Sequence, residues 1–165
     1  MRLSAVAAGM IGLASVALAP PAAGQRPDNQ IVPKSAEFQH QGEALLAAGK
    51  FEQAEDALEA ALTVDPRNRW AFVDIAKVAD KQHLFGKAIR MTNKALLLEP
   101  NDPDAIAVQG EAMVELGATA RAQANLKKLQ AICSKGCPQV AQLSSAITRG
   151  RSVASAKAPP TPKPD

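Results

Sequence analysis

The sequence predicts an all-α fold made of repeated helix pairs, and three observations lead to this prediction. Small residues recur at a spacing of 34 positions through the middle of the chain, and a fixed spacing of this size is typical of stacked helical repeats. The recurring positions are Gly42, Ala76 and Gly110, and Ala54, Ala88 and Ala122. Two prolines, Pro66 and Pro100, follow apolar stretches at the same spacing. Aromatic residues make up only 3% of the 165 residues, and Ala and Leu dominate the 47% that are hydrophobic, which favours helices over sheets.

The first two helix pairs are expected over residues 35–48 and 51–64, and over residues 69–81 and 85–98. Gly49 lies between the first two helices, where a glycine can adopt the left-handed conformation of a turn. The second helix of each pair is expected to end at Asp65-Pro66 or at Glu99-Pro100, because the residue before a proline disfavours the helical conformation. Small residues at the recurring positions let the paired helices approach closely, and larger side chains there would overpack the contact.

A third pair is expected over residues 103–116 and 119–132, followed by a capping helix over residues 138–149. Asp102 precedes Pro103, an order typical of an N-cap residue followed by proline at the first helical position. The apolar residues of the seventh helix are Val140, Leu143 and Ile147, which fall on one face. A capping helix needs such a face to cover the last repeat and a polar face toward water.

The order of residue types resembles the tetratricopeptide repeat family. The resemblance is carried by AGKFEQAEDALEAALTVDPRN (48–68), by LFGKAIRMTNKALLLEPND (84–102) and, more weakly, by ELGATARAQANLKKLQ (115–130). It covers roughly residues 35–133 and implies an α-solenoid of about three helix-turn-helix pairs, over 35–68, 69–102 and 103–136, plus the C-terminal capping helix. The chain departs from the family pattern where His83 replaces a glycine, Thr119 an aromatic residue and Leu129 a small residue.

The resemblance also implies a function: binding of a protein or peptide on a concave face lined by the first helix of each pair. Transferred by register, the groove residues are Gln39, Glu43, Trp70, Val73, Lys77, Asp104, Ala107 and Glu111. Trp70 is the only Trp, and it fits equally an interaction hot spot and a core residue between neighbouring pairs. Some members of the family hold the C-terminal carboxylate of a peptide with Lys, Arg and Asn. The acidic residues of this groove argue against such a clamp and favour a ligand that carries Lys or Arg.

Charge and motifs exclude several other classes of protein. The 19 Lys and Arg and the 16 Asp and Glu give a net charge of +3, which is too mixed for a dedicated nucleic-acid-binding protein. No nucleophile-elbow motif or phosphate-binding glycine loop is present. His40 and His83 lack the spacing of metal ligands. We therefore predict an interaction scaffold or adaptor without cofactor or metal and without catalytic residues, and self-association through exposed repeat faces remains an open alternative.

The two ends of the chain are expected to lie outside the repeat domain. Residues 1–24 read as a secretory signal peptide, with Arg2 before an apolar run and small residues before a cleavage site at Gln25. Residues 25–34 contain two prolines and are expected to be a linker, and residues 150–165 a disordered Pro-rich tail. We expect no stable membrane span after cleavage and a periplasmic or secreted protein.

Cys133 and Cys137 are the only cysteines, and an even number in an exported protein favours a disulfide. Such a bridge would hold the end of the last repeat to the capping helix, and a similar Cys pair is found at the C-terminal end of some small exported bacterial tetratricopeptide proteins. A thiol-redox or metal-handling role of the pair is the alternative function. The thioredoxin-type C-x-x-C spacing and further metal ligands nearby are both missing from the sequence.

Overall fold

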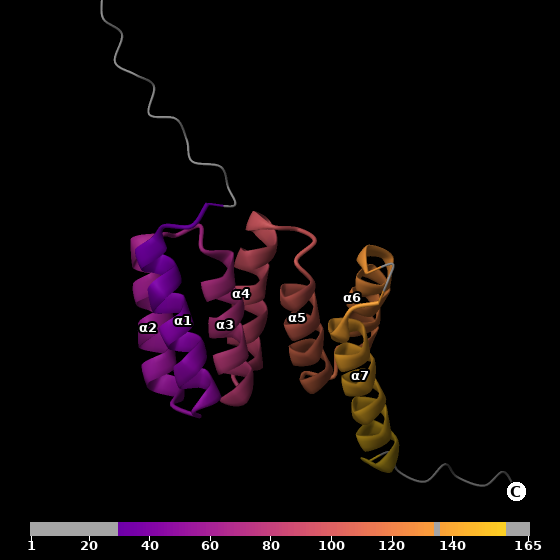
Figure 1. The fold of residues 1–165 in the computed structure, drawn as a ribbon. Helices are drawn as coiled ribbons and strands as arrows, with labels where there is room; N and C mark the ends of the chain where they lie inside the picture. The colour runs from indigo at the N-terminus through magenta and orange to yellow at the C-terminus, as the bar shows by residue number, and fades with distance from the viewer. Residues whose placement is uncertain (1–29, 134–135, 158–165) are drawn as a thin grey trace, which may run out of the picture.

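The computed structural model describes residues 30–133 and 136–157, with side chains as far as residue 150. The described part of the chain forms seven α-helices and contains no strand. The helices are α1 (Pro33–Ala47), α2 (Phe51–Val64), α3 (Arg69–Lys81), α4 (Phe85–Leu98), α5 (Pro103–Glu115), α6 (Thr119–Ile132) and α7 (Pro138–Lys157). Figure 1 shows them side by side in a row, from the α1–α2 pair at one end to α6 and α7 at the other. The all-α prediction is confirmed, and α1 begins at Pro33, slightly before the predicted start.

Each pair of consecutive helices packs as a hairpin, and each hairpin packs on the next through α2 with α3 and α4 with α5. The side chains of Asn68 and Asp102 each accept a hydrogen bond from the backbone N–H three residues on, at Ala71 (3.2 Å) and Ala105 (2.9 Å). These two N-caps satisfy donors that would otherwise be exposed at the start of α3 and α5. The loops before these helices are therefore built alike, as the repeated sequence predicts.

The last helix is longer than predicted. It continues past Arg149 to Lys157, so the prediction of a disordered segment is wrong for residues 150–157. Gly150 lies inside this helix and does not end it. A Cβ at this position would lie 2.5 Å from Cγ1 of Val114, so the absence of a side chain lets α7 lie close to α5. The signal peptide, the linker up to residue 29 and the tail from residue 158 lie outside the described residues.

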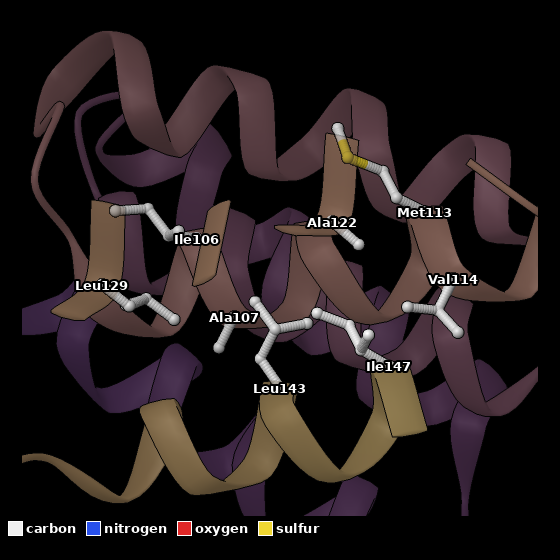
Figure 2. Packing of buried hydrophobic residues seen from close by; sticks show 8 residues of the cluster. All are labelled: Ile106, Ala107, Met113, Val114, Ala122, Leu129, Leu143 and Ile147. Atoms are coloured by element: carbon white, nitrogen blue, oxygen red, sulfur yellow. The ribbon is translucent and has the colours of Figure 1, made fainter. Parts of the chain in front are cut away.

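Glycines allow the closest approaches between helices. A Cβ at Gly42 would lie 2.5 Å from Cγ of Leu58, and a Cβ at Gly110 would lie 2.6 Å from Cδ2 of Leu143. Leu58 and Leu143 are fully buried, so each leucine fills the space above a glycine. Figure 2 shows the second of these regions, in which Leu143 and Ile147 of α7 pack against residues of α5 and α6. The apolar face predicted for α7 is therefore the face that covers the last repeat.

The turns within the three pairs share one conformation. Gly49, His83 and Gly117 stand at the same position of successive repeats and have positive φ angles of 70°, 59° and 73°. A left-handed conformation costs a residue with a Cβ more than it costs glycine. The departure from the family pattern at His83 therefore leaves the fold intact and places a strained residue in the second turn.

Cys133 and Cys137 are joined by a disulfide, as predicted. Cys133 directly follows α6, and Cys137 directly precedes α7. Closing so short a loop contributes about 2 kcal/mol in a chain-entropy estimate. The bridge therefore acts locally, by fixing the turn that directs α7 back onto α5 and α6.

We expect Gly42→Ala and Gly86→Ala to change stability in opposite directions. The methyl group at residue 42 would collide with Leu58, whereas the nearest atom to a Cβ at residue 86 is a flexible Arg90 Nη1 at 3.7 Å. Gly42→Ala should lower the free energy of unfolding by about 1–3 kcal/mol, and Gly86→Ala should raise it by about 0.5 kcal/mol. Urea unfolding followed by circular dichroism measures both, and equal effects would contradict the close packing of α1 on α2.

His83→Gly should stabilise the protein by about 0.5–1 kcal/mol, because glycine adopts the positive φ without strain. Part of the gain is offset by loss of the edge contact between the His83 and Phe85 rings, whose centroids are 5.7 Å apart. The control is Gln82→Gly at the preceding position, where φ is −86° and glycine should destabilise. A lower melting temperature for His83→Gly than for the unmodified protein would show that the turn carries no such strain.

Candidate binding groove on the concave face

The odd-numbered helices form the inner side of a curved stack. Contacts join α1 to α3, α3 to α5 and α5 to α7, whereas α2, α4 and α6 do not contact one another. A stack whose helices touch on one side and stay apart on the other is curved, and the side on which they touch is concave. We call the exposed surface of α1, α3, α5 and α7 the concave face. It is the face for which the sequence predicted binding.

The structure places most of the predicted groove residues on this face but not all of them. Glu43 and Trp70 are exposed, and Lys77, Asp104 and Glu111 are half-buried. Val73 and Ala107 are only 2% and 1% exposed, so the structure places both in the interior and not on the concave surface. Val73 packs with Ala95 and Ala105 between α3, α4 and α5. Ala107 lies beneath α7, in the cluster drawn in Figure 2.

A row of polar side chains links the odd helices across the floor of the concave face. The Gln39 amide donates a 2.6 Å hydrogen bond to one carboxylate oxygen of Asp74, and the Lys77 ammonium donates a 2.8 Å bond to the other. Farther along, the Gln139 amide of α7 donates a 2.6 Å bond to Asp104 of α5. Gln39 is therefore buried as part of the floor. Sequence reasoning missed Asp74, although its spacing of three residues from Lys77 puts both side chains on one helical face.

Burial and charge act against each other in this row. Burial raises the pKa of the Asp74 carboxyl, with a further contribution from the charge of Glu43, while Lys77 and Gln39 oppose the shift. For Lys77, burial alone would lower the pKa, but Asp74, Asp104 and Glu43 together raise it above its ordinary value. Lys77 therefore stays protonated at neutral pH, and its charge is held by Asp74.

On one side of the polar row lies a hollow of about 370 Å³ between α1 and α3, which we call the Trp70 hollow. Ile31, Ala36 and Trp70 supply apolar wall, and Glu43 stands at its edge. Trp70 is 40% exposed, and the Arg69 guanidinium lies 3.9 Å from its ring centroid. Of the two interpretations of Trp70, the structure supports the surface one, since none of the buried clusters among the described residues includes it.

On the other side of the row lies a hollow of about 200 Å³, which we call the Glu111 hollow. It is lined by Leu46, Lys77, Asp80, Lys81, Val108, Glu111 and Gln142, from α1, α3, α5 and α7. The Oδ1 atom of Asp80 is buried and has no hydrogen-bond partner among the described residues. Asp80 was not among the predicted site residues, because its partners in this hollow come from helices that are distant in sequence.

The surroundings of the Glu111 hollow disfavour the ionised form of both of its carboxyl groups. Burial raises the pKa of Glu111, and the charge of Asp80 adds to this, against the Gln142 hydrogen bond and the charges of Lys81 and Arg149. Burial also raises the pKa of Asp80, with Glu115 adding to the shift and Lys81 and His83 opposing it. A cation that entered the hollow would relieve both carboxylates.

No other chemical centre stands out in the described residues. They hold no group of three or more His, Cys, Asp or Glu side chains that could bind a metal ion. Within the same ranges, none of the helices combines the length and hydropathy of a membrane span. The two hollows and the polar row between them are features of the concave face that a ligand could use.

We expect Glu111→Gln to stabilise the protein at pH 7 and not at acidic pH. A carboxyl whose pKa is raised on folding costs stability when ionised, and the cost disappears as the pH falls below the ordinary pKa of the unfolded chain, about 4.5. The gain at pH 7 should be small, about 1–3 °C in melting temperature, because the side chain is partly screened by water. Thermal melts at pH 7 and pH 3.5 measure it. The control is Glu59→Gln on the exposed surface of α2, and an equal gain in this control would contradict the interpretation.

Comparison with known proteins agrees with the fold. Residues 45–112 match the tetratricopeptide repeat. A search of curated proteins finds no match to this sequence. Among solved structures, the tetratricopeptide domain of Sgt2 from Aspergillus fumigatus superposes with a TM-score of 0.70 at 20% identity, over 86% of this chain and 95% of that one.

Two further solved structures contain a bound partner. The first tetratricopeptide domain of Spaghetti (RPAP3), bound to the HSP90 peptide SRMEEVD, has a TM-score of 0.65 at 16% identity, over 74% of this chain and 94% of that one. PcrH, in complex with the chaperone-binding region of PopD, has a TM-score of 0.61 at 18% identity, over 74% of this chain and 92% of that one. The repeat match supports the tetratricopeptide family, and the described helices form an all-α, solenoid-like tetratricopeptide fold.

Proposed function

We propose that this protein is an exported adaptor that binds a segment of another protein on its concave face. The observation that carries the proposal is the pair of hollows separated by the polar row, all on the inner side of one stack. Rigid helices hold these groups in place, so a ligand would lose little free energy in ordering them. The similar domains of RPAP3 and PcrH are each described with a bound peptide or protein region, which supports the same use of this fold.

The proposed ligand differs in charge from the peptide of the RPAP3 complex. That peptide, SRMEEVD, carries three acidic residues. The concave face of this protein carries Glu43, Asp104 and Glu111, which would repel such a ligand. The proposal is therefore a tetratricopeptide adaptor with a partner of another kind, and not a clamp for an acidic C-terminus.

Export is the second part of the proposal. Its support is the expected signal peptide in residues 1–24 together with the Cys133–Cys137 disulfide, since disulfides persist in oxidising compartments such as the periplasm. An adaptor in this location would act in the cell envelope or outside the cell.

We expect Trp70→Ala, and separately the pair Glu43→Lys and Glu111→Lys, to abolish most of the binding. A central aromatic residue contributes about 2 kcal/mol or more to an interface, which corresponds to a loss of about thirtyfold in affinity. The measurement is quantitative mass spectrometry of proteins captured by the C-terminally tagged full chain, expressed in its native host. The intact mass of the recovered protein should correspond to a chain that begins at Gln25.

The matched controls are Leu84→Ala and the pair Glu52→Lys and Glu59→Lys, which remove an exposed leucine and reverse two exposed charges away from the concave face. Melting temperatures within about 2 °C of the unmodified protein confirm that all variants are folded. Capture that is unchanged in the concave-face variants would refute the binding proposal. Recovery of the protein with its first residues intact would refute export.

A further inference from the structure

We propose that the concave face recognises an extended peptide with a bulky apolar side chain about five residues from a Lys or Arg. The apolar side chain would enter the Trp70 hollow, and the cationic group would enter the Glu111 hollow. This inference rests on the proposed function and names the chemistry and the spacing of the ligand. Three observations carry it: the character of each hollow, the charge of the face, and the distance between the hollows along α3.

The Trp70 hollow suits an apolar side chain. Its wall includes Ile31, Ala36 and Trp70, and the contact with Arg69 holds the indole ring in position. Trp70 is held in place and still exposes 40% of its surface. It can therefore bury further apolar area when a ligand arrives, without being reoriented. A Leu, Met or Phe side chain is the kind of group that gains most from such a surface.

The Glu111 hollow suits an ammonium or guanidinium group. The buried Oδ1 of Asp80 lacks a hydrogen-bond donor among the described residues, and an acceptor left unsatisfied in this way destabilises the folded state. The Glu111 carboxylate lines the same hollow. The hydrogen bond that the Lys77 ammonium donates goes to Asp74 and to neither of these two groups. Lys81 stands exposed, so water screens its charge more strongly than it screens the buried oxygen of Asp80.

The charge of the whole face favours the same ligand. Carboxylates outnumber cations among the charged residues on the concave face. The acidic residues there are Glu43, Asp74, Asp80, Asp104 and Glu111, and the basic ones are Arg69, Lys77, Lys81 and Arg149. An excess of carboxylates in the groove attracts a basic segment to it.

The spacing follows from α3, which contributes to both hollows. Trp70 and Asp80 are ten positions apart on this helix, which corresponds to about 15 Å along its axis. The Trp70 hollow opens toward α1 and the Glu111 hollow reaches α5 and α7, so the path between them is oblique and slightly longer. An extended peptide covers about 3.3–3.6 Å per residue, so about five residue steps join the two hollows. A helical ligand would need about ten or eleven.

The test uses synthetic peptides and the full-length exported protein. Fluorescein-labelled peptides on a neutral Gly-Ser background carry one Phe and one Lys, two, five, eight or eleven positions apart and in both orders. Fluorescence anisotropy should show the tightest binding at a separation of five positions. The affinity at separations of two and eight should be lower by threefold or more. The same series is measured with the double variant Asp80→Asn and Glu111→Gln. Its matched control is Asp56→Asn with Glu59→Gln on the exposed surface of α2.

The double variant should bind the Phe–Lys peptide no better than a peptide with norleucine in place of Lys, whereas the control variant should keep the preference for Lys. A best separation of eleven would overturn the extended geometry. Equal binding of Lys and norleucine peptides by the unmodified protein would overturn the cation site. Either of these results leaves the proposed function intact if Trp70→Ala still abolishes capture of the natural partner. The binding part of the proposed function fails only if that capture is unchanged.

Discussion

The close approach of helices at positions without bulky side chains is the constraint on which the rest of this structure depends. Where Gly42 faces Leu58 and Gly110 faces Leu143, a single methyl group would displace a buried leucine. Helices this close bury Ala and Leu side chains completely, with almost no aromatic residues to fill space. Cohesion in the stack therefore comes from the fit of small and large aliphatic groups, which tolerates little change in volume.

Polar side chains on the concave face also join neighbouring odd helices. Side chains of neighbouring odd helices meet each other directly, as Gln39 meets Asp74 and Asp104 meets Gln139. Such buried bonds fix the relative positions of neighbouring repeats, because a partner left unpaired in the interior costs more than the bond contributes. The floor of the groove is thus a structural element, and the hollows on either side of it are the parts left open to a ligand.

Most of the fold could be predicted from the sequence, because the repeat spacing fixes the positions of the turns and the turns fix the helices. The end of α7 could not, since Gly150 resembles a helix end until its contact with Val114 is known. The residues of the candidate site were harder to predict than the fold. Register within a repeat identifies the right helices, but a helical position one residue away decides between the buried Val73 and the floor residue Asp74. Asp80 becomes a candidate ligand-binding residue only because Glu111 of α5 and Gln142 of α7 line the same hollow. Sequence patterns do not show that these two helices lie beside it.

The entry of the chain into α1 has a practical meaning for work on this protein. The backbone N–H of Val32 donates a 3.0 Å hydrogen bond to a carboxylate oxygen of Asp65, in the loop between α2 and α3. Ile31, the residue before it, forms part of the wall beside Trp70. Anything joined directly before Ile31 would therefore start at the mouth of that cavity. An affinity handle or fluorescent fusion placed there would stand in the way of a guest, whereas one attached after α7 would leave the mouth clear.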